Sequence, residues 1–452
     1  MAKSKWTRRH FLGATGLATL TDARLLTVHA EVNAQYRFRA ASIQDEVINS
    51  EVLVCGGGPS GFAAAVMAAR GGAKVLLLER YGRLGGMAVH ARVAPLMGRS
   101  DSPFVREILG RIGGPRLDPD RLDLQYADMI QEAGADLRLH SWAFQTLLEA
   151  GRVTGVRLVT KQGTMQARAK VIVDATGDGD VAFGAGAAFE KGRSDDGLMQ
   201  PMSIMFTVAG LEEATALYCG GEREARKIHV GGRSWEAIVN KGRRDKELPE
   251  HVGVVRTYRT SRPGEAVVNA TQINYVDGTK VKDLTKAELE GRRQAFRIID
   301  FLKKHAPGYT RAYISGMPAV IGVRETRRFL GVKYLKRADL LAGRRCEDAV
   351  VRNASFVIDI HNPNGAGQVE DLARRVKPYD IPYGCLVPEK IDGLLLAGRC
   401  ISGSHDAHAS YRVQQIAMAI GAAAGAAAAE AVKSRVIPRS VNIGRVQAVL
   451  WS

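Results

Sequence analysis

The chain has 452 residues, a formal net charge of +17, 46% hydrophobic residues and 25% charged residues, as in a globular protein with two or three domains. The chain has no basic run interleaved with aromatic residues, no zinc-finger spacing and no RNA-binding signature, which argues against a nucleic-acid partner. Its five cysteines form no C-x-x-C pair, which excludes the usual iron–sulfur and dithiol redox motifs. We therefore interpret the positive charge as a generally basic, solvated surface.

The N-terminus resembles a twin-arginine export signal. Arg8 and Arg9 precede Phe11-Leu12 and a run of small and apolar residues, and Val28-His29-Ala30 fits a small-residue cleavage site. Asp22 and Arg24 interrupt the apolar region, so a basic disordered leader in a cytoplasmic protein is the alternative. We expect residues 1–30 to direct export to the periplasm. We expect no transmembrane segment in the mature chain, because no apolar run is expected to reach the roughly 18 residues of a membrane span.

The next stretch has the pattern of strand, glycine turn, helix, strand and acid. Glu51–Cys55 is short and mostly apolar, as in a buried strand, and G-x-G-x-x-G follows it at once. An alanine-rich helix is expected over Phe62–Arg70, and a second strand over Lys74–Leu78 ends in Glu79. The whole pattern predicts a dinucleotide-binding βαβ unit.

Each glycine of this motif has its own physical role. Gly56 allows the tight turn, Gly58 lets a pyrophosphate approach the backbone, and Gly61 lets the helix pack closely on the strand. The helix N-terminus offers free N–H groups to phosphates. Glu79 lies 18 residues past Gly61, where an acid can accept hydrogen bonds from a ribose.

The middle of the chain alternates between helical and extended patterns. Gly85-Gly86 lets the backbone pass close to a second phosphate or to the flavin side of a longer dinucleotide. Residues 103–134 are expected to be helical with breaks, and three short stretches between Thr146 and Ala169 to form a β-meander. A buried strand over Val171–Thr176 then ends in the turn 177–180, where α/β sheets place ligands.

Residues 189–313 form the candidate for a second domain that covers the cofactor. Strands are expected over Ser203–Val208 and Ala266–Val276. Thr285-Lys-Ala-Glu288 is a capping box that predicts the start of an amphipathic helix running to about His305. The polar stretch from Gly220 to Arg262 gives no clear assignment.

The C-terminal part returns to the sheet. A strand is expected over Ile391–Gly398, then a loop from Arg399 to Ser410, and then a long alanine-rich helix over Arg412–Val432. Residues 436–452 form a tail without an assignment.

In this order, the motifs resemble those of the FAD-dependent oxidoreductase family of the glutathione-reductase-like flavoprotein superfamily, from about residue 50 to residue 435. The motifs that carry the resemblance are VLVCGGGPSGFAAA, LLLERYGRLGGM, GRVTGV with VIVDATGDGD, DLTKAELEGRRQA, PGY, GVRETRR, DIHNP, DIPYGCLVP and LLLAGRCISGSHDAH. Gly384 departs from the pattern, because the family leads us to expect arginine after DIPY, and the substrate is therefore expected to differ from that of relatives.

The resemblance implies noncovalently bound FAD in an α/β fold. That fold is a Rossmann-like FAD-binding domain, with βαβ unit, β-meander and C-terminal helix, plus a smaller mixed α+β substrate or cap domain. The expected domains are residues 1–30 as leader, 50–188 and 316–435 as the two parts of the FAD-binding domain, 189–315 as cap and 436–452 as tail. The residues expected to bind the cofactor are Gly56, Gly58, Gly61, Glu79, Arg80, Gly86, Gly177, Asp178, Gly398 and Arg399.

The catalytic residues are expected after the last strand. A flavin-dependent oxidation of an alcohol or amine needs a base for the coupled proton, and positive charge near the reduced flavin. His405 and His408 are candidates for the base or a substrate contact, the alternative being hydrogen bonds to backbone in a tight loop. Arg412, in the first turn of the expected helix, is the candidate for the positive charge. No third and fourth ligands accompany these histidines, so no metal site is predicted.

Other charged motifs leave two interpretations open. His361 is a weaker candidate for the site, and His90 for a covalent flavin link. The cluster Arg324–Arg328 is suited either to clamping a substrate carboxylate or to an ion-pair network between domains.

The function expected from these features is that of an FAD-dependent dehydrogenase. It takes hydride from a small polar substrate and passes electrons to an acceptor that the sequence does not identify. The alternatives are an NAD(P)H-dependent flavin monooxygenase or reductase, disfavoured because no second G-x-G-x-x-G domain is evident, and a non-catalytic electron-relay subunit. The sequence leaves the oligomeric state open.

Overall fold

The computed structural model describes residues 46–93, 95–115, 118–369 and 376–452. The predicted twin-arginine leader lies outside the described residues. Glu46–Ser452 forms one compact unit that contains two separate hydrophobic cores. The first core is built from residues before Phe189 and after Thr326, and the second from Met202 to Val323. No observation tests the domain boundaries themselves, and they stay a prediction.

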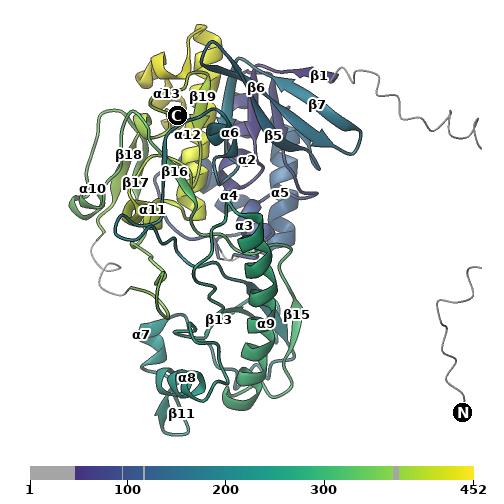
Figure 1. Cartoon of the computed structure of the whole chain (residues 1–452), viewed down its shortest axis with the longest axis vertical. Coiled ribbons are helices and arrows are strands. Elements are labelled where there is room, and N and C mark those ends of the chain that lie inside the picture. The colour runs from purple at the N-terminus through teal and green to yellow at the C-terminus, as the bar shows by residue number, and fades with distance from the viewer. Residues whose placement is uncertain (1–45, 94, 116–117, 370–375) are drawn as a thin grey trace, which may run out of the picture. The chain divides into compact units, whose positions relative to one another are not determined.

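A five-stranded parallel sheet forms the centre of the first core (Figure 1). Every residue of its three central strands is buried, as expected for parallel strands with both faces covered. Cys55 pairs with Leu78 and with Asp174, so these strands end at the same edge of the sheet. In spatial order the strands are β19 (Leu394–Leu396), β8 (Val171–Asp174), β2 (Val52–Cys55), β3 (Val75–Leu78) and β4 (Asp136–Arg138).

Two helices from distant parts of the sequence pack together on this sheet. They are α2 (Pro59–Arg70) and α12 (Gln414–Ser434), which touch each other along their lengths and also contact β2 and β8. Small residues make this possible, because a Cβ added at Gly421 would lie 2.0 Å from the Ser60 carbonyl oxygen. The predicted βαβ unit and the late return of the chain to the same sheet are thereby confirmed.

The predicted β-meander is present as β5 (Trp142–Glu149), β6 (Arg152–Thr160) and β7 (Gly163–Arg168). It contacts the parallel sheet through β6 and β8. A fourth strand, β1 (Glu46–Asn49), pairs in parallel with β7. β1 was not predicted from the sequence, because this strand is short and mostly exposed and therefore lacks a hydrophobic pattern.

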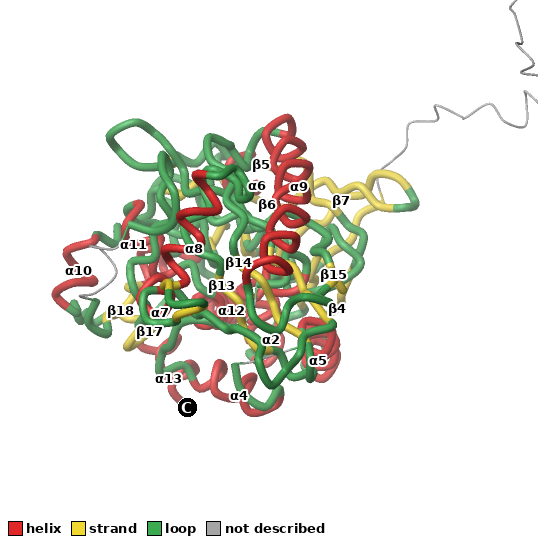
Figure 2. Tube along the Cα trace, turned by 90° about the horizontal axis from the view of Figure 1, so that it is seen from below, coloured by secondary structure: helices red, strands yellow, loops and turns green. Residues whose placement is uncertain are grey.

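The second core lies beneath a four-stranded antiparallel sheet and a long helix. The strands, in spatial order, are β13 (Arg256–Arg259), β14 (Glu265–Asn269), β10 (Met205–Ala209) and β15 (Tyr313–Gly316). The helix is α9 (Val281–His305), which Figures 1 and 2 show beside these strands. We call this sheet and helix the cap.

The predicted capping box of α9 is wrong. The helix begins at Val281, four residues before Thr285, with Lys280 at the N-cap position. Thr285 lies inside the helix, and its hydroxyl donates to the Val281 carbonyl oxygen at 2.9 Å. A threonine can satisfy its hydroxyl this way within a helix, which is why the capping pattern misplaced the helix start.

Two expectations for the C-terminal part also need correction. The residues predicted as a loop include helix α11 (His405–Tyr411), which Ser404 caps by accepting a hydrogen bond from Ala407 N at 3.2 Å. Arg412 follows α11 as its C-cap and precedes α12, so it does not lie in the first turn of the long helix. The tail without an assignment contains η4 (Pro438–Ser440) and helix α13 (Ile443–Trp451), both of which contact α12.

Helix α12 also corrects the expectation that no apolar run reaches the length of a membrane span. It is the one helix among the described residues that meets this length and apolar composition, and its apolar stretch is 89% buried inside the protein. Its contacts with α2 and the sheet account for its apolar character.

Shorter elements complete the described part of the chain. The helices are α3 (Gly86–Val89), α4 (Pro103–Arg111), α5 (Pro119–Glu132), α6 (Asp180–Gly184), α7 (Glu222–Ala225), α8 (Trp235–Arg244), α10 (Arg337–Ala342) and the 3-10 turn η3 (Tyr383–Cys385). The strands are β9 (Phe189–Lys191), β11 (His229–Val230), β12 (Arg233–Ser234), β16 (Arg327–Phe329), β17 (Ala349–Ala354) and β18 (Tyr379–Pro382).

Candidate active site

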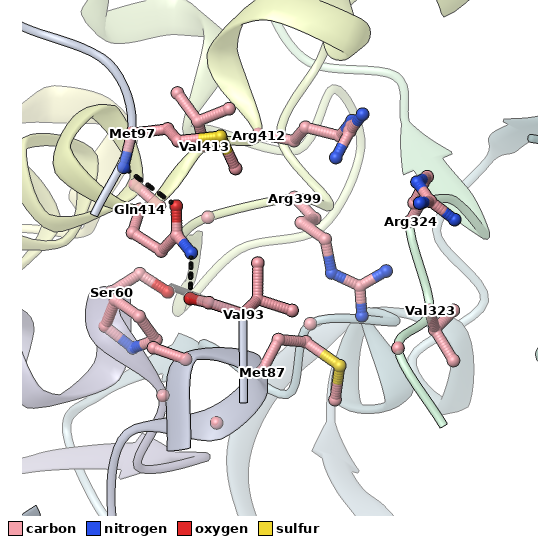
Figure 3. A pocket seen from close by; sticks show the side chains of 18 of the residues that line it. Ser60, Met87, Val93, Met97, Val323, Arg324, Arg399, Arg412, Val413 and Gln414 are labelled. Atoms are coloured by element: carbon pink, nitrogen blue, oxygen red, sulfur yellow. Dashed lines mark hydrogen bonds between the residues drawn. The ribbon is translucent and has the colours of Figure 1, made fainter. Parts of the chain in front are cut away.

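A cavity of about 370 Å³ lies between the parallel sheet and the cap (Figure 3). At one end it is lined by the turn after β2 and by Glu79 and Trp142. At the other end, which we call the cap end, it is lined by residues of β13 and β14 and by His361. The cavity thus begins where parallel sheets bind dinucleotides and continues into the second core.

The glycine turn at the sheet end leaves room that the fold itself does not use. A Cβ on Gly61 would lie 1.7 Å from the Gly56 carbonyl oxygen, so helix packing alone requires glycine there. A Cβ on Gly58 would meet nothing closer than Gly86 Cα at 3.7 Å. Gly58 lines the cavity and is the N-cap residue of α2, which has no side-chain cap. The free N–H groups of this helix end face a space that suits a pyrophosphate.

Glu79 lies at the end of β3, as predicted, and lines the cavity. It is 5% exposed, and its carboxylate accepts hydrogen bonds from Gly57 N at 2.7 Å and Tyr81 N at 2.9 Å. Burial raises its pKa, against the effect of these hydrogen bonds. The carboxylate therefore supports the glycine turn and retains lone pairs for a ribose. Arg80 also lines the cavity, with its guanidinium over the Tyr81 ring.

Three further glycine positions bring distant segments to the same cavity. Gly86 and Gly58 are so close that a Cβ on Gly86 would lie 2.9 Å from Gly58 Cα. Gly177 follows β8 and Gly398 follows β19, with φ of 83° and 90°, values that favour glycine. All three line the cavity. The backbone can therefore approach a long dinucleotide from several sides.

Arg399 and Asp178 form a pair at the wall of the cavity. Arg399 Nη2 donates to Asp178 Oδ1 at 2.8 Å, and Thr326 Oγ1 donates to the same oxygen at 2.7 Å. Arg399 lines the cavity, whereas Asp178 does not and instead orients the arginine. Arg399 Nη1 is buried without a hydrogen-bond partner among the described residues. This donor and the glycine-lined channel fit the carbonyl oxygens and phosphates of FAD.

The two histidines predicted as catalytic do not line the cavity. His405 is 9% exposed, and its Nδ1 lies 2.9 Å from Glu325 Oε1, which also accepts from Arg328. His408 is 1% exposed and packs edge-on against the Tyr411 ring. Because both belong to helix α11, and not to a loop, their side chains turn into the core. Their positions do not support the predicted substrate contact.

Among the described histidines, His361 lines the cavity, although the sequence made it a weaker candidate than His405 and His408. Its Nε2 lies 3.6 Å from Asp359 Oδ1, and its Nδ1 makes no hydrogen bond within the described residues. Burial and the nearby Arg324 guanidinium lower the pKa of His361. The imidazole is therefore neutral at neutral pH, and the same two effects lower its affinity for a proton. Burial disfavours charge on Asp359, but the nearby Arg412 and Arg324 guanidinium groups hold its pKa below the ordinary value.

Three arginines surround this pair at the cap end of the cavity. Arg412 Nη2 donates to the Asp359 carboxylate at 3.1 Å, and its Nε is buried without a partner among the described residues. Arg256 is 7% exposed and pairs with Glu222. Arg324 Nη1 donates to the Pro201 carbonyl oxygen at 2.6 Å. Figure 3 shows Arg324, Arg399 and Arg412 gathered on one side of the cavity, with Ser60 of α2 on the other.

The rest of the predicted arginine cluster is structural. Arg327 Nη1 donates to Asp180 at 2.9 Å, and Arg328 bonds Glu325 and the Gly192 carbonyl oxygen. Both arginines are buried in the described structure. The cluster therefore divides, with Arg324 at the cavity and its neighbours in an ion-pair network. His90, for which a covalent flavin link was considered, lies 3.0 Å from the Arg83 carbonyl oxygen and does not line the cavity.

Several cavity residues were missed by the sequence analysis. Arg256 and Tyr258 come from β13, inside the stretch that had no assignment, and Asn269 ends β14. Four-residue strands carry too little periodicity to be recognised from the sequence. The pairing of β13 with β14 is what brings these side chains to the cavity.

His408 gives a testable effect on acid stability. Burial and nearby arginines hold its pKa well below 6.5, so the unfolded chain binds more protons than the folded chain below that pH. The contribution of His408 to the free energy of unfolding is therefore lost as the pH falls below 6.5. We expect His408→Leu to reduce the loss of unfolding free energy between pH 7 and pH 5 by about 2 kcal/mol, measured by urea unfolding. The exposed-site variant His229→Leu should behave like wild type, and an unchanged pH dependence in His408→Leu would contradict the account.

The sheet-edge glycine turn and the cavity that continues from it define an α/β enzyme that binds a flavin dinucleotide. Residues 51–450 match the model of the family described as FAD dependent oxidoreductase. The chain belongs to this family, and its cofactor is FAD.

Proteins with similar sequences match only part of this chain. A digeranylgeranylglycerophospholipid reductase of Thermoplasma volcanium is 29% identical over 159 residues, which cover 28% of this chain and 39% of that protein. The reductase of the same name from Methanosarcina acetivorans is 28% identical over 218 residues, which cover 41% of this chain and 50% of that protein. The matches thus span at most half of these relatives.

Among solved structures, a geranylgeranyl bacteriochlorophyll reductase-like protein from Thermoplasma acidophilum is 16% identical. The alignment covers 89% of this chain and 82% of that chain, with a TM-score of 0.44. Because the two chains are only 16% identical, we infer the substrate of this enzyme from its own cavity and not from that protein.

Proposed function

We propose that this enzyme is a dehydrogenase that oxidises a small polar substrate at a carbon bearing a hydroxyl or amino group, with His361 as the base. The observation that carries the proposal is the His361–Asp359 pair, which lines the same cavity as the glycine turn and Arg399. When bound, FAD supplies a two-electron acceptor that takes hydride at N5.

The residues of this chain would handle the proton and the charge. As the substrate C–H bond breaks and its electron pair leaves as hydride, His361 accepts the proton of the hydroxyl or amino group, and a C=O or C=N bond forms. Asp359 then stabilises the imidazolium. The 3.6 Å separation of His361 and Asp359 exceeds a hydrogen bond in the free enzyme and would shorten when the imidazole gains charge.

The start of α12 would supply the positive potential that the reaction needs near the reduced flavin. Val413 and Gln414 line the cavity at the N-terminal end of this helix, whose dipole favours negative charge. Gln414 is fixed by hydrogen bonds to the Val93 carbonyl oxygen at 2.8 Å and from Met97 N at 3.2 Å (Figure 3). Arg412 adds a full positive charge beside the helix start, the role expected for it although its place in the helix differs.

Anaerobic bleaching of the flavin absorbance tests the proposal. The purified enzyme would be mixed with alcohols, amines, amino acids, hydroxy acids and sugars, and separately with NADH and NADPH. We expect at least one hydroxyl or amino compound to bleach the flavin without a nicotinamide. Bleaching by NADH or NADPH alone would support a monooxygenase or reductase instead, and bleaching by none of them would support an electron-relay subunit.

We also propose that the enzyme is exported by the twin-arginine route, on the basis of Arg8-Arg9 and the residues after them. Replacing both arginines with lysine keeps the charge of the leader. We expect this variant to accumulate inside the cell in its uncleaved, flavin-containing form, whereas wild type appears in the periplasmic fraction. Equal export of both proteins, measured by fractionation and immunoblotting, would contradict the proposal.

A further inference from the structure

One guanidinium at the cap end of the cavity lacks a carboxylate partner. Arg412 pairs with Asp359, and Arg256 pairs with Glu222. Arg324 forms no ion pair with any carboxylate among the described residues, and its hydrogen bond there goes to a neutral carbonyl oxygen. Among the described residues, two carboxylates therefore face these three guanidinium groups.

The surroundings of Arg324 disfavour its charge. Burial and the neighbouring Arg412 guanidinium lower the pKa of Arg324 to about 9, with Arg256 acting in the same direction and the Asp359 carboxylate opposing them. A cation in this position is costly unless an anion accompanies it. Arg324 lines the cavity, so an anion bound in the cavity can reach it.

We propose that the cap end of the cavity binds one carboxylate group of the substrate, with Arg324 as the residue that pairs with it. This inference rests on the proposed dehydrogenase function and names its substrate class: a small 2-hydroxy or 2-amino carboxylate. A planar guanidinium can hold a carboxylate through two parallel hydrogen bonds. The adjacent carbon would then lie near His361, which lines the same end.

Neutral polar groups complete this end of the cavity. Tyr258, Asn269 and Gln368 line it, and Asn269 Nδ2 donates to the Tyr258 hydroxyl at 3.5 Å. The Tyr258 hydroxyl proton is thus free to be donated to a substrate oxygen within the described site. Among the described residues, this end carries a single net positive charge and neutral donors, which fits one carboxylate better than two.

Binding of this carboxylate would also strengthen the base. Arg324 is the charge that most lowers the proton affinity of His361, after burial. A substrate carboxylate beside Arg324 offsets that effect, so His361 becomes a better proton acceptor when the site is filled. Asp359, Arg256 and Arg412 face the same space and keep their own pairs throughout.

The test is ligand binding to the oxidised, FAD-loaded enzyme without turnover. Glyoxylate, pyruvate and phenylpyruvate, and the neutral amides of the same acids, would be titrated while the flavin absorbance spectrum is recorded. We expect the 2-oxo carboxylates to shift the spectrum with saturation and the amides to bind much more weakly. Arg324→Met should raise the Kd of the carboxylates by about 30-fold or more.

Two matched variants make the result specific. Arg324→Lys keeps the charge but loses the planar fork, and we expect it to recover part of the affinity. Arg311→Met removes an exposed arginine of the cap that does not line the cavity, and it should bind the carboxylates like wild type. Flavin content of each variant shows that the cofactor site is intact. Equal affinity for amides and carboxylates, or an unchanged Kd in Arg324→Met, would overturn the inference.

This binding test separates the inference from the proposed function. Saturable carboxylate binding that depends on Arg324, without flavin reduction by any hydroxy or amino acid, would support the carboxylate site and refute the dehydrogenase. Flavin reduction by neutral alcohols, without carboxylate binding, would support the dehydrogenase and refute the carboxylate site.

Discussion

Replacing His361 with asparagine should slow flavin reduction by substrate about 10²- to 10⁴-fold, the usual contribution of a positioned base. FAD should stay bound, because His361 lies at the cap end of the cavity and not at the glycine turn. Asparagine keeps a polar side chain beside Asp359 but cannot take up the proton. Anaerobic stopped-flow absorbance measures the rate directly.

Substitutions of other histidines test whether His361 is the base, as the cavity indicates, or whether His405 or His408 is, as the sequence predicted. His229→Asn changes an exposed histidine of β11 and should leave the rate of flavin reduction unchanged. His408→Asn should affect stability more than the rate, because His408 does not line the cavity. A normal rate in His361→Asn, combined with a large loss in His405→Asn or His408→Asn, would return the catalytic role to α11.

Gly58→Ala should weaken FAD binding while the protein remains folded. The added Cβ meets nothing of the protein closer than 3.7 Å, so the fold can accept it. The same Cβ would displace a pyrophosphate that lies against this backbone. An overpacked contact of this kind costs about 1–3 kcal/mol of binding free energy, which raises the Kd for FAD about 5- to 150-fold. Flavin fluorescence during titration of the apoprotein with FAD measures the Kd.

Two other glycines provide the comparison. Gly61→Ala places a Cβ 1.7 Å from a backbone oxygen, so it should impair both folding and FAD binding. Gly110→Ala, in α4, introduces a Cβ into open space and should leave both unchanged. If Gly58→Ala binds FAD as tightly as wild type, the pyrophosphate does not lie against the glycine turn.

The sequence predicted the FAD-binding half of the molecule well, because local signals coincide there. A buried strand, three glycines at fixed spacing and an acid after the second strand are all set by residues 51–79. Gly177 and Gly398 could be added because each follows an apolar strand and the family resemblance joins them. Eight of the ten residues expected at the cofactor line the cavity, and the two that do not are Gly61 and Asp178.

The catalytic end could not be predicted in the same way, because it is assembled by tertiary structure. Arg256 is held by the pairing of β13 with β14, whereas His361 and Arg324 line the cavity from other segments of the chain. His405 and His408 looked suitable because they follow the last strand of the sheet. Their helix, capped by Ser404, turns both side chains into the core, and the sequence pattern around them did not reveal that cap.

The most direct test of the central claim is a crystal structure of the FAD-loaded enzyme with pyruvate bound. The claim is that FAD runs from the glycine turn toward the cap end, where Arg324 and His361 hold the substrate. The account predicts pyrophosphate oxygens on the N-terminus of α2, a carboxylate paired with Arg324, and the ligand's second carbon about 3–3.5 Å from flavin N5. A flavin ring separated from His361 and Arg324 by protein, or a pyruvate bound away from both, would contradict it.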